Sequence, residues 1–159
     1  MRRMNLLLVL PGIMAGSALL VFAHAEGPAV EYMSAEQIAT AVAAPTDTAV
    51  AKQMNTDSGT VIWSIKRAQS GEVELHRNWN DVIIAKEGTV KVLIGEKVEG
   101  NRLFKPNEWL GGKIIGGHEY TLKPGDILFI PAGLGHQMTL TGREPFTYLV
   151  IKTAAHAPS

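Results

Sequence analysis

Short runs of aliphatic and β-branched residues, separated by turns rich in glycine, dominate the chain from Thr60 onward. Eleven of the 16 glycines lie between positions 88 and 142, mostly between these runs. The runs predict strands at 61–66, 72–78, 81–86, 89–94, 113–115, 119–122, 126–130, 137–141 and 146–152. So many short strands, with almost no room for helices, predict an all-β fold built as an antiparallel barrel or sandwich.

The first 25 residues follow a different pattern, which is typical of a secretory signal peptide. Arginines at positions 2 and 3 precede an uncharged stretch at 6–23, and Ala23-His24-Ala25 provides a small-x-small cleavage site. A retained membrane anchor is the alternative, because the stretch is close to the roughly 20 apolar residues that span a bilayer. The lack of a basic flank after the stretch favours cleavage. We therefore expect a periplasmic or secreted protein with no membrane anchor.

Between the signal peptide and the strands, residues 26–58 are expected to form a short helix followed by a linker. Ser34 and Gln37 have the spacing of a capping box, the residues up to Ala44 are mostly good helix formers, and Pro45 ends the run. The barrel is then expected over 59–153. A flexible tail is expected at 154–159.

Composition narrows the chemistry that such a barrel can host. The 15 Lys and Arg residues balance the 15 Asp and Glu residues, so there is no basic excess for binding nucleic acid. The chain has no Cys, which excludes disulfides, zinc sites with Cys ligands and thiol nucleophiles. It has no G-x-S-x-G motif and no glycine-rich loop that opens a helix. Histidines and carboxylates remain for metal or acid–base chemistry.

One segment carries a specific resemblance. The run from Gly125 to His136 has the spacing G-x5-P-x-G-x2-H of the second cupin motif, although Leu140 replaces the Asn that ends this motif. A weaker counterpart of the first motif, H-x-H-x3-4-E-x6-G, runs from Glu74 to Gly88. Over about residues 60–152 the chain resembles the small single-domain cupins of the conserved β-barrel type. The resemblance implies a double-stranded β-helix, a jelly-roll barrel that forms homodimers, but it names no reaction.

The resemblance also implies a metal site, and two registers of the first motif are open. In one, the ligands are Glu74, His76, Asp81 and His136; in the other, His76 is the first motif histidine and Asn78 replaces the second. Alternation places Glu74, His76 and Asn78 on one strand face. Both registers keep a set of two histidines and one carboxylate, which suits divalent Fe, Mn, Ni or Zn. Without a metal, the histidines would be hydrogen-bonded interior residues of a polar cavity.

Four further roles are expected around this set. Glu74 is a general base if it is not a ligand, and His118, after two glycines at a strand start, is a candidate acid–base residue or a solvent-exposed position. Asn78 and Trp79 are candidates for the wall of a substrate pocket, with core or dimer packing as the alternative for Trp79. The segment 105–112 is expected to be an irregular loop, either a lid or a surface loop.

Three classes of function follow from these residues. The leading one is a metal-dependent enzyme, of oxygenase or isomerase/lyase type, that acts on a small polar molecule. The second is a cupin module that binds a small ligand without turnover. The third is a structural scaffold, which is disfavoured because burying Glu74, Asp81 and two histidines is costly unless something compensates their polar groups. The sequence does not name the substrate, and whether the protein is an enzyme stays open.

Overall fold

The structure is a computed structural model that describes residues 32–43, 49–54 and 59–155. The expected signal peptide lies outside these residues, and so do residues 156–159 of the expected tail. Within the described ranges, no helix has both the length and the apolar character needed to cross a membrane.

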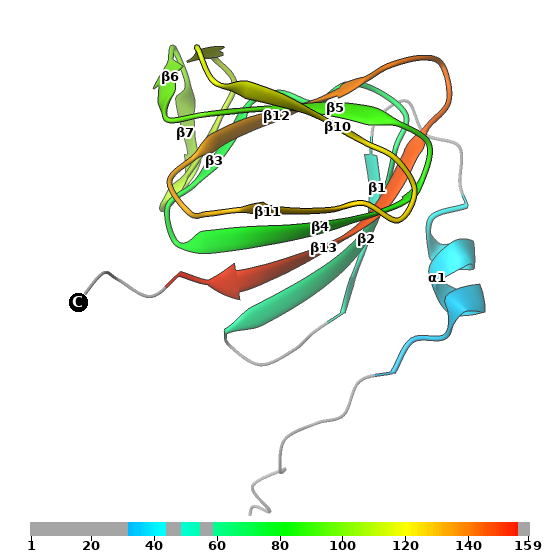
Figure 1. Cartoon of the computed structure of the whole chain (residues 1–159). Helices are drawn as coiled ribbons and strands as arrows, with labels where there is room; N and C mark the ends of the chain where they lie inside the picture. The colour runs from blue at the N-terminus through cyan, green and yellow to red at the C-terminus, as the bar shows by residue number, and fades with distance from the viewer. Residues whose placement is uncertain (1–31, 44–48, 55–58, 156–159) are drawn as a thin grey trace, which may run out of the picture.

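One helix, two facing sheets and a small two-stranded ribbon make up the described fold (Figure 1). The helix is α1 (Ala35–Ala41). The strands are β1 (Ala49–Met54), β2 (Thr60–Arg67), β3 (Glu74–His76), β4 (Trp79–Glu87), β5 (Val90–Gly95), β6 (Lys97–Glu99), β7 (Arg102–Lys105), β8 (Glu108–Leu110), β9 (Lys113–Ile115), β10 (His118–Leu122), β11 (Ile127–Ile130), β12 (Gly135–Leu140) and β13 (Phe146–Ala154).

The strands pair antiparallel throughout. One sheet has the order β1-β2-β13-β4-β11, the second has the order β10-β5-β12-β3-β8-β7, and β6 and β9 form a small separate ribbon. Both large sheets contain strands from distant parts of the chain, as in β13, which lies between β2 and β4. The prediction of an all-β antiparallel fold is therefore confirmed.

Four strands were not predicted, and one was predicted too long. The expected linker contains β1, no element was expected at β6 and at most of β7, and the expected irregular loop at 105–112 contains the end of β7 and all of β8. The predicted strand at 72–78 is shorter, because β3 covers only Glu74–His76. These strands are short or polar, so their own sequences carry little apolar alternation, and it is the pairing with neighbouring strands that makes them extended.

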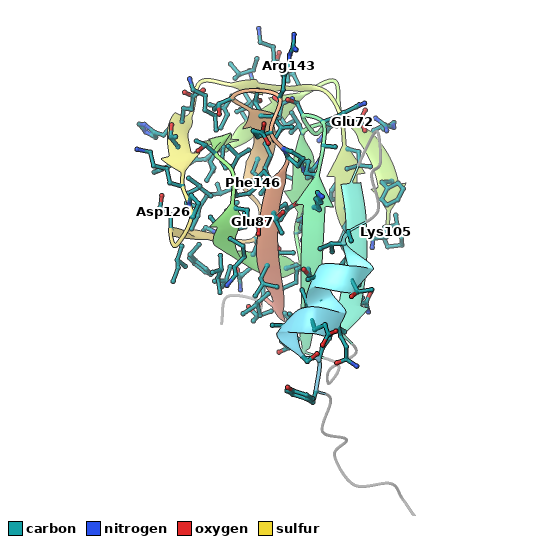
Figure 2. All side chains as sticks on the ribbon, turned by 90° about the vertical axis from the view of Figure 1, so that its right-hand side faces the viewer. Glu72, Glu87, Lys105, Asp126, Arg143 and Phe146 are labelled. Carbon is teal, nitrogen blue, oxygen red and sulfur yellow. The ribbon has the colours of Figure 1, made fainter. Side chains whose placement is uncertain are left out.

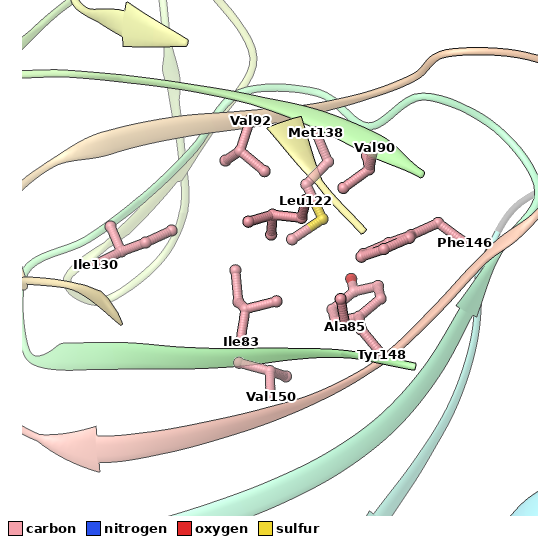
Figure 3. Close-up of a cluster of buried hydrophobic side chains, with 10 residues drawn as sticks. All are labelled: Ile83, Ala85, Val90, Val92, Leu122, Ile130, Met138, Phe146, Tyr148 and Val150. Atoms are coloured by element: carbon pink, nitrogen blue, oxygen red, sulfur yellow. The ribbon is translucent and has the colours of Figure 1, made fainter. Parts of the chain in front are cut away.

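The hydrophobic core fills the space between the two sheets (Figure 3). Its buried members are Ile83, Ala85, Val90, Val92, Leu122, Ile130, Met138, Phe146, Tyr148 and Val150. Along β13 the inward positions alternate with outward ones, as expected for a strand with one face on the core. Figure 2 shows Glu72 and Asp126 at the periphery of the molecule, whereas Phe146 lies inside.

Helix α1 begins with the capping box that its sequence predicts. The Ser34 hydroxyl accepts a hydrogen bond from the Gln37 backbone N–H (3.1 Å), and the Gln37 side chain accepts one from the Ser34 backbone N–H (2.8 Å). The helix ends at Ala41, three residues before the predicted end at Ala44. Val42 and Leu149 line one hollow on the outer face of the first sheet, so α1 lies away from the barrel interior.

Candidate metal centre

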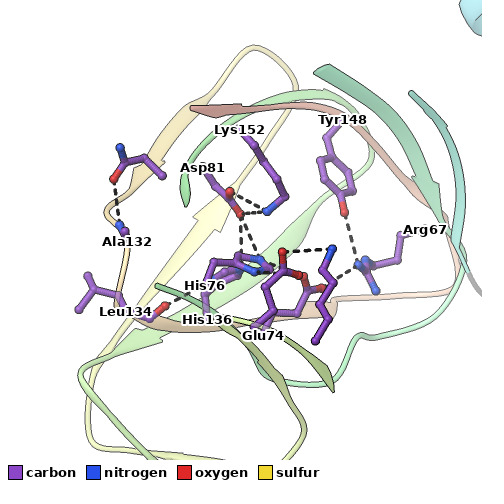
Figure 4. A network of polar contacts seen from close by, with 12 residues as sticks. Arg67, Glu74, His76, Asp81, Ala132, Leu134, His136, Tyr148 and Lys152 are labelled. Atoms are coloured by element: carbon purple, nitrogen blue, oxygen red, sulfur yellow. Dashed lines mark hydrogen bonds and ion pairs between the residues drawn. The ribbon is translucent and has the colours of Figure 1, made fainter. Parts of the chain in front are cut away.

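Two facing sheets bring the predicted metal ligands together inside the barrel (Figure 4). Glu74 on β3 and His136 on β12 are directly opposite each other across the strand pair, and His76 lies one inward position further along β3. Asp81 comes from β4 in the other sheet. His76, Asp81 and His136 are all buried. The cluster therefore depends on the closure of the barrel rather than on one local segment.

The distances within the cluster fit a shared ion better than direct hydrogen bonds. His76 Nε2 lies 3.4 Å from Glu74 Oε2 and 3.7 Å from Asp81 Oδ2, and His136 Nε2 lies 3.6 Å from Asp81 Oδ2. These separations exceed the usual range of hydrogen bonds. Two ligand atoms that each lie about 2.1 Å from one tetrahedral ion are separated by about 3.4 Å.

An unsatisfied histidine supports the same interpretation. Neither ring nitrogen of His76 has a hydrogen-bond partner among the described residues, although its side chain is only 6% exposed. A buried polar atom without a partner is costly, and a metal ion would use its lone pair. Ligand atoms of Glu74, His76 and His136 all lie within 4.8 Å of one another. These three residues fit a divalent ion, with Asp81 beside them.

The protonation states of two ligands also suit a metal. Burial acts to raise the pKa of Glu74, but His76, His136 and Arg67 outweigh this effect and lower it to about 2. Burial lowers the pKa of His136, and this effect exceeds the opposing influence of Glu74 and Asp81. At neutral pH Glu74 is therefore ionised and the His136 imidazole is neutral, as metal ligands must be.

We expect the metal-free protein to lose stability as pH falls below about 6.5. Because burial depresses the pKa of His136, the unfolded chain takes up a proton near its ordinary value while the folded chain stays unprotonated. The unfolding free energy should fall by at most about 1.4 kcal/mol per pH unit from this group. Urea unfolding at pH 7.5, 6.5 and 5.5 measures the slope. A His136→Gln variant should have a shallower slope, and an unchanged slope would contradict the assignment.

Asp81 has a second partner that the sequence analysis missed. Lys152 is directly opposite Asp81 across the β4–β13 pair, and its Nζ donates to both carboxylate oxygens of Asp81, at 2.7 and 2.8 Å. Tyr148, Val150 and Lys152 are alternate residues of β13, and the first two face the barrel interior. The alternation along this strand could therefore have indicated that Lys152 faces the interior as well. Asp81 is thus neutralised by the fold itself, while Glu74 is not held in a comparable pair.

Glu108 is a further member of the site that the sequence analysis missed. It is opposite His76 across the β3–β8 pair, its Oε2 lies 3.5 Å from His76 Nδ1, and its side chain is largely buried. Lys105 holds the other carboxylate oxygen of Glu108 at 3.1 Å. A carboxylate behind a ligating histidine fixes the orientation of the ring and leaves the far nitrogen for the metal. The sequence did not indicate Glu108 as a site residue, because its segment was expected to be an irregular loop.

Removing the Glu108 carboxylate should weaken metal binding without removing a ligand. We expect Glu108→Ala to raise the dissociation constant for a divalent ion by about 10- to 100-fold, the usual effect of losing such an outer partner. Competition with a chromogenic chelator measures this constant. Glu119→Ala is the matched control, because Glu119 pairs with Lys91 on an exposed strand. Equal affinities of the two variants would show that Glu108 does not position His76.

The other expected site residues lie at the edge of the cluster or outside it. Asn78 is exposed in the bend after β3, so the strand alternation that would place it beside Glu74 and His76 has already ended. Trp79, half-buried at the start of β4, lies with Leu134 against the two histidines and Asp81, in a hollow with no room for a water molecule. Of the two alternative registers, the geometry brings Glu74 rather than Asn78 to the histidines.

His118 lines a different hollow from the one around the cluster. It is exposed at the start of β10 and borders an open hollow of about 440 Å³ together with Tyr120, Lys97 and Leu134. Although this hollow is the larger one, it contains none of the clustered ligands. Leu134 also borders the tight hollow beside the histidines, so it separates His118 from the candidate metal centre.

Comparisons with known proteins identify the fold of the barrel. Residues 112–152 match the family described as the cupin domain. The protein TT1209 from Thermus thermophilus has a similar structure, with a TM-score of 0.55 and 20% identity over 79% of this chain and 98% of its own. The barrel has the cupin fold.

Two further solved cupin structures agree with this assignment. The cupin domain of Cnp3 from Schizosaccharomyces pombe has a TM-score of 0.52 and 7% identity over 69% of this chain and 67% of its own. A cupin superfamily protein from Desulfitobacterium hafniense has a TM-score of 0.50 and 15% identity over 70% of this chain and 83% of its own. No curated protein matches the sequence significantly. The family match over part of the barrel and the similarity to these structures show the cupin fold.

The family match covers only one side of the candidate metal centre. It includes His136 but begins only at residue 112, after Glu74, His76 and Asp81. The jelly-roll prediction is confirmed for the cupin barrel as a whole. The candidate ligands other than His136 are therefore identified from the structure of this chain and not from the family match.

Proposed function

We propose that this cupin binds one divalent metal ion through Glu74, His76 and His136 and acts as an enzyme on a small polar molecule. The observation that carries the proposal is the meeting of these three ligand atoms around a buried histidine whose nitrogens have no hydrogen-bond partner among the described residues. A divalent ion in such a site supplies a Lewis acid with coordination positions open to a substrate. The folded chain itself contributes the three ligand side chains, which it already holds close together.

The metal part of the proposal is tested by equilibrium dialysis followed by elemental analysis. Purified protein is dialysed separately against Fe(II), Mn(II), Ni(II) and Zn(II), and we expect about one ion per chain for at least one of them. Uptake far below one ion per chain for all four would overturn it. Turnover of small polar substrates that is lost on chelation and restored by the same metal would support an enzyme.

A ligand-binding cupin without turnover is the second candidate, and one observation favours it. Lys152 pairs with Asp81 and Arg67 lies near Glu74, so these four side chains carry no net negative charge that demands a cation. A metal-free protein whose melting temperature rises with a small ligand, with no product formed, would favour this function over catalysis.

We also propose that the protein is exported and forms a homodimer. The uncharged stretch at 6–23 and the following cleavage pattern support export. Ile127 and Phe129 support self-association, because both are large apolar side chains exposed on β11 at the edge of the first sheet. Mass determination of the secreted protein by light scattering tests both points.

A further inference from the structure

A small cavity lies inside the barrel next to the candidate metal centre. Its volume is about 60 Å³, enough for a few water molecules or for a small organic ion. Glu74, Asp81 and His136 border it, together with the apolar side chains of Ile65 and Val150. The cavity therefore offers a space beside the metal ligands that has both polar and apolar walls.

Arg67 borders this cavity with unused hydrogen-bonding capacity. Its side chain is only 14% exposed, and its Nε has no hydrogen-bond partner among the described residues. Its Nη2 lies 3.4 Å from the Tyr148 hydroxyl and 3.6 Å from Glu74 Oε1, both longer than a good charge-assisted hydrogen bond. A buried guanidinium in these surroundings lacks a well-placed acceptor.

Tyr148, which lies beside Arg67, adds a second donor to the lining of the cavity. Its oxygen is the acceptor for Arg67, so the hydroxyl hydrogen remains available for another group. Burial raises the pKa of Tyr148, which keeps the hydroxyl protonated at neutral pH. Arg67 and Tyr148 together present a cation and a neutral donor to whatever occupies the cavity.

The charged side chains around the cavity indicate which charge a bound molecule should carry. Glu74 and Asp81 balance Arg67 and Lys152, so these four side chains sum to zero before a metal binds. The nearby Glu108 is balanced by Lys105. A divalent ion would leave two uncompensated positive charges in a buried site, which is unfavourable unless an anion accompanies it.

From these features we infer that the metal-loaded barrel binds a small carboxylate, with its charged group at Arg67 and Tyr148 and its short apolar part against Ile65 and Val150. A planar carboxylate matches the guanidinium fork, and the apolar wall suits an alkyl group. The inference rests on the proposed metal binding and adds the substrate class. Acetate is the smallest ligand of this class that carries both parts.

The test compares acetate with acetamide, a neutral molecule of nearly the same shape. Protein loaded with one zinc ion per chain is titrated with each molecule, and binding is followed by calorimetry and by the melting temperature. We expect acetate to bind and to raise the melting temperature, and acetamide to bind at least tenfold more weakly. Equal binding of the two molecules would overturn the inference, whereas failure to take up zinc or any other divalent ion would overturn the proposed function instead.

Two variants locate the carboxylate in this cavity rather than on the metal alone. Arg67→Met should weaken acetate binding by about tenfold or more at unchanged zinc stoichiometry. Tyr148→Phe, which removes one hydroxyl and keeps the ring, should weaken it severalfold and guards against misfolding of the first variant. Arg102→Met is the matched control, because Arg102 pairs with Glu72 on the exposed surface. If both cavity variants bind acetate as tightly as this control does, the inference is wrong.

Discussion

Metal affinity should fall by more than about 100-fold when His76 is replaced by alanine. His76 is the central ligand of the cluster, since its Nε2 faces both Glu74 and Asp81 at 3.4 and 3.7 Å. Loss of an outer partner typically costs 10- to 100-fold in metal affinity, and loss of a ligand should cost more. Equilibrium dialysis over a range of zinc concentrations measures the dissociation constant.

His118→Ala is the matched control for this substitution. It removes the same side chain from an exposed position on β10 that borders the separate outer hollow. We expect its zinc affinity to equal that of the unaltered protein. The two histidine variants therefore distinguish a specific ligand from general loss of imidazole groups. Wild-type affinity in His76→Ala would remove the ligand assignment on which the proposed function rests.

Truncation of Phe146 should destabilise the barrel by about 3–5 kcal/mol. The side chain is completely buried, and its ring stacks on that of Tyr148 with the centroids 5.1 Å apart. Phe146→Ala loses the burial of the ring, loses this aromatic contact and leaves a cavity between the sheets. Urea denaturation followed by far-UV circular dichroism gives the change in unfolding free energy.

Phe104→Ala provides the comparison for the core variant. Phe104 is 61% exposed on β7, so truncation should change the unfolding free energy by about 0.5 kcal/mol or less. A loss below about 1 kcal/mol in Phe146→Ala would contradict the packing described for the core. A large loss in Phe104→Ala would indicate that β7 is covered by another surface in solution.

Much of the fold could be predicted from the sequence because glycine and apolar alternation mark the long strands. β4 and β13 carry continuous alternation, and both were predicted within two residues at each end. β1 and β8 could not be predicted in this way, since they are extended mainly by pairing with β2 and β3. Tertiary pairing thus decided the conformation where the local pattern was weak.

The candidate site could also be predicted only in part from the sequence. The motif-like spacing pointed to Glu74, His76, Asp81 and His136, and the structure brings all four to one cluster. It did not reveal Glu108, which reaches the site only through the register of β3 with β8. Register sets which side chains meet across a barrel, and short motifs do not encode it.

The ion pair between Asp81 and Lys152 has a consequence for the order of assembly. Small zinc domains stay unfolded until metal arrives, because the free energy of metal binding supplies the free energy of folding. Here Lys152 donates a hydrogen bond to the Asp81 carboxylate, and the core consists of packed hydrophobic side chains that do not need an ion. We expect protein treated with EDTA to keep its β-sheet circular dichroism spectrum, and loss of that spectrum would show that folding needs the metal. Folding first and loading afterwards would let the compartment in which the chain matures determine which ion it carries.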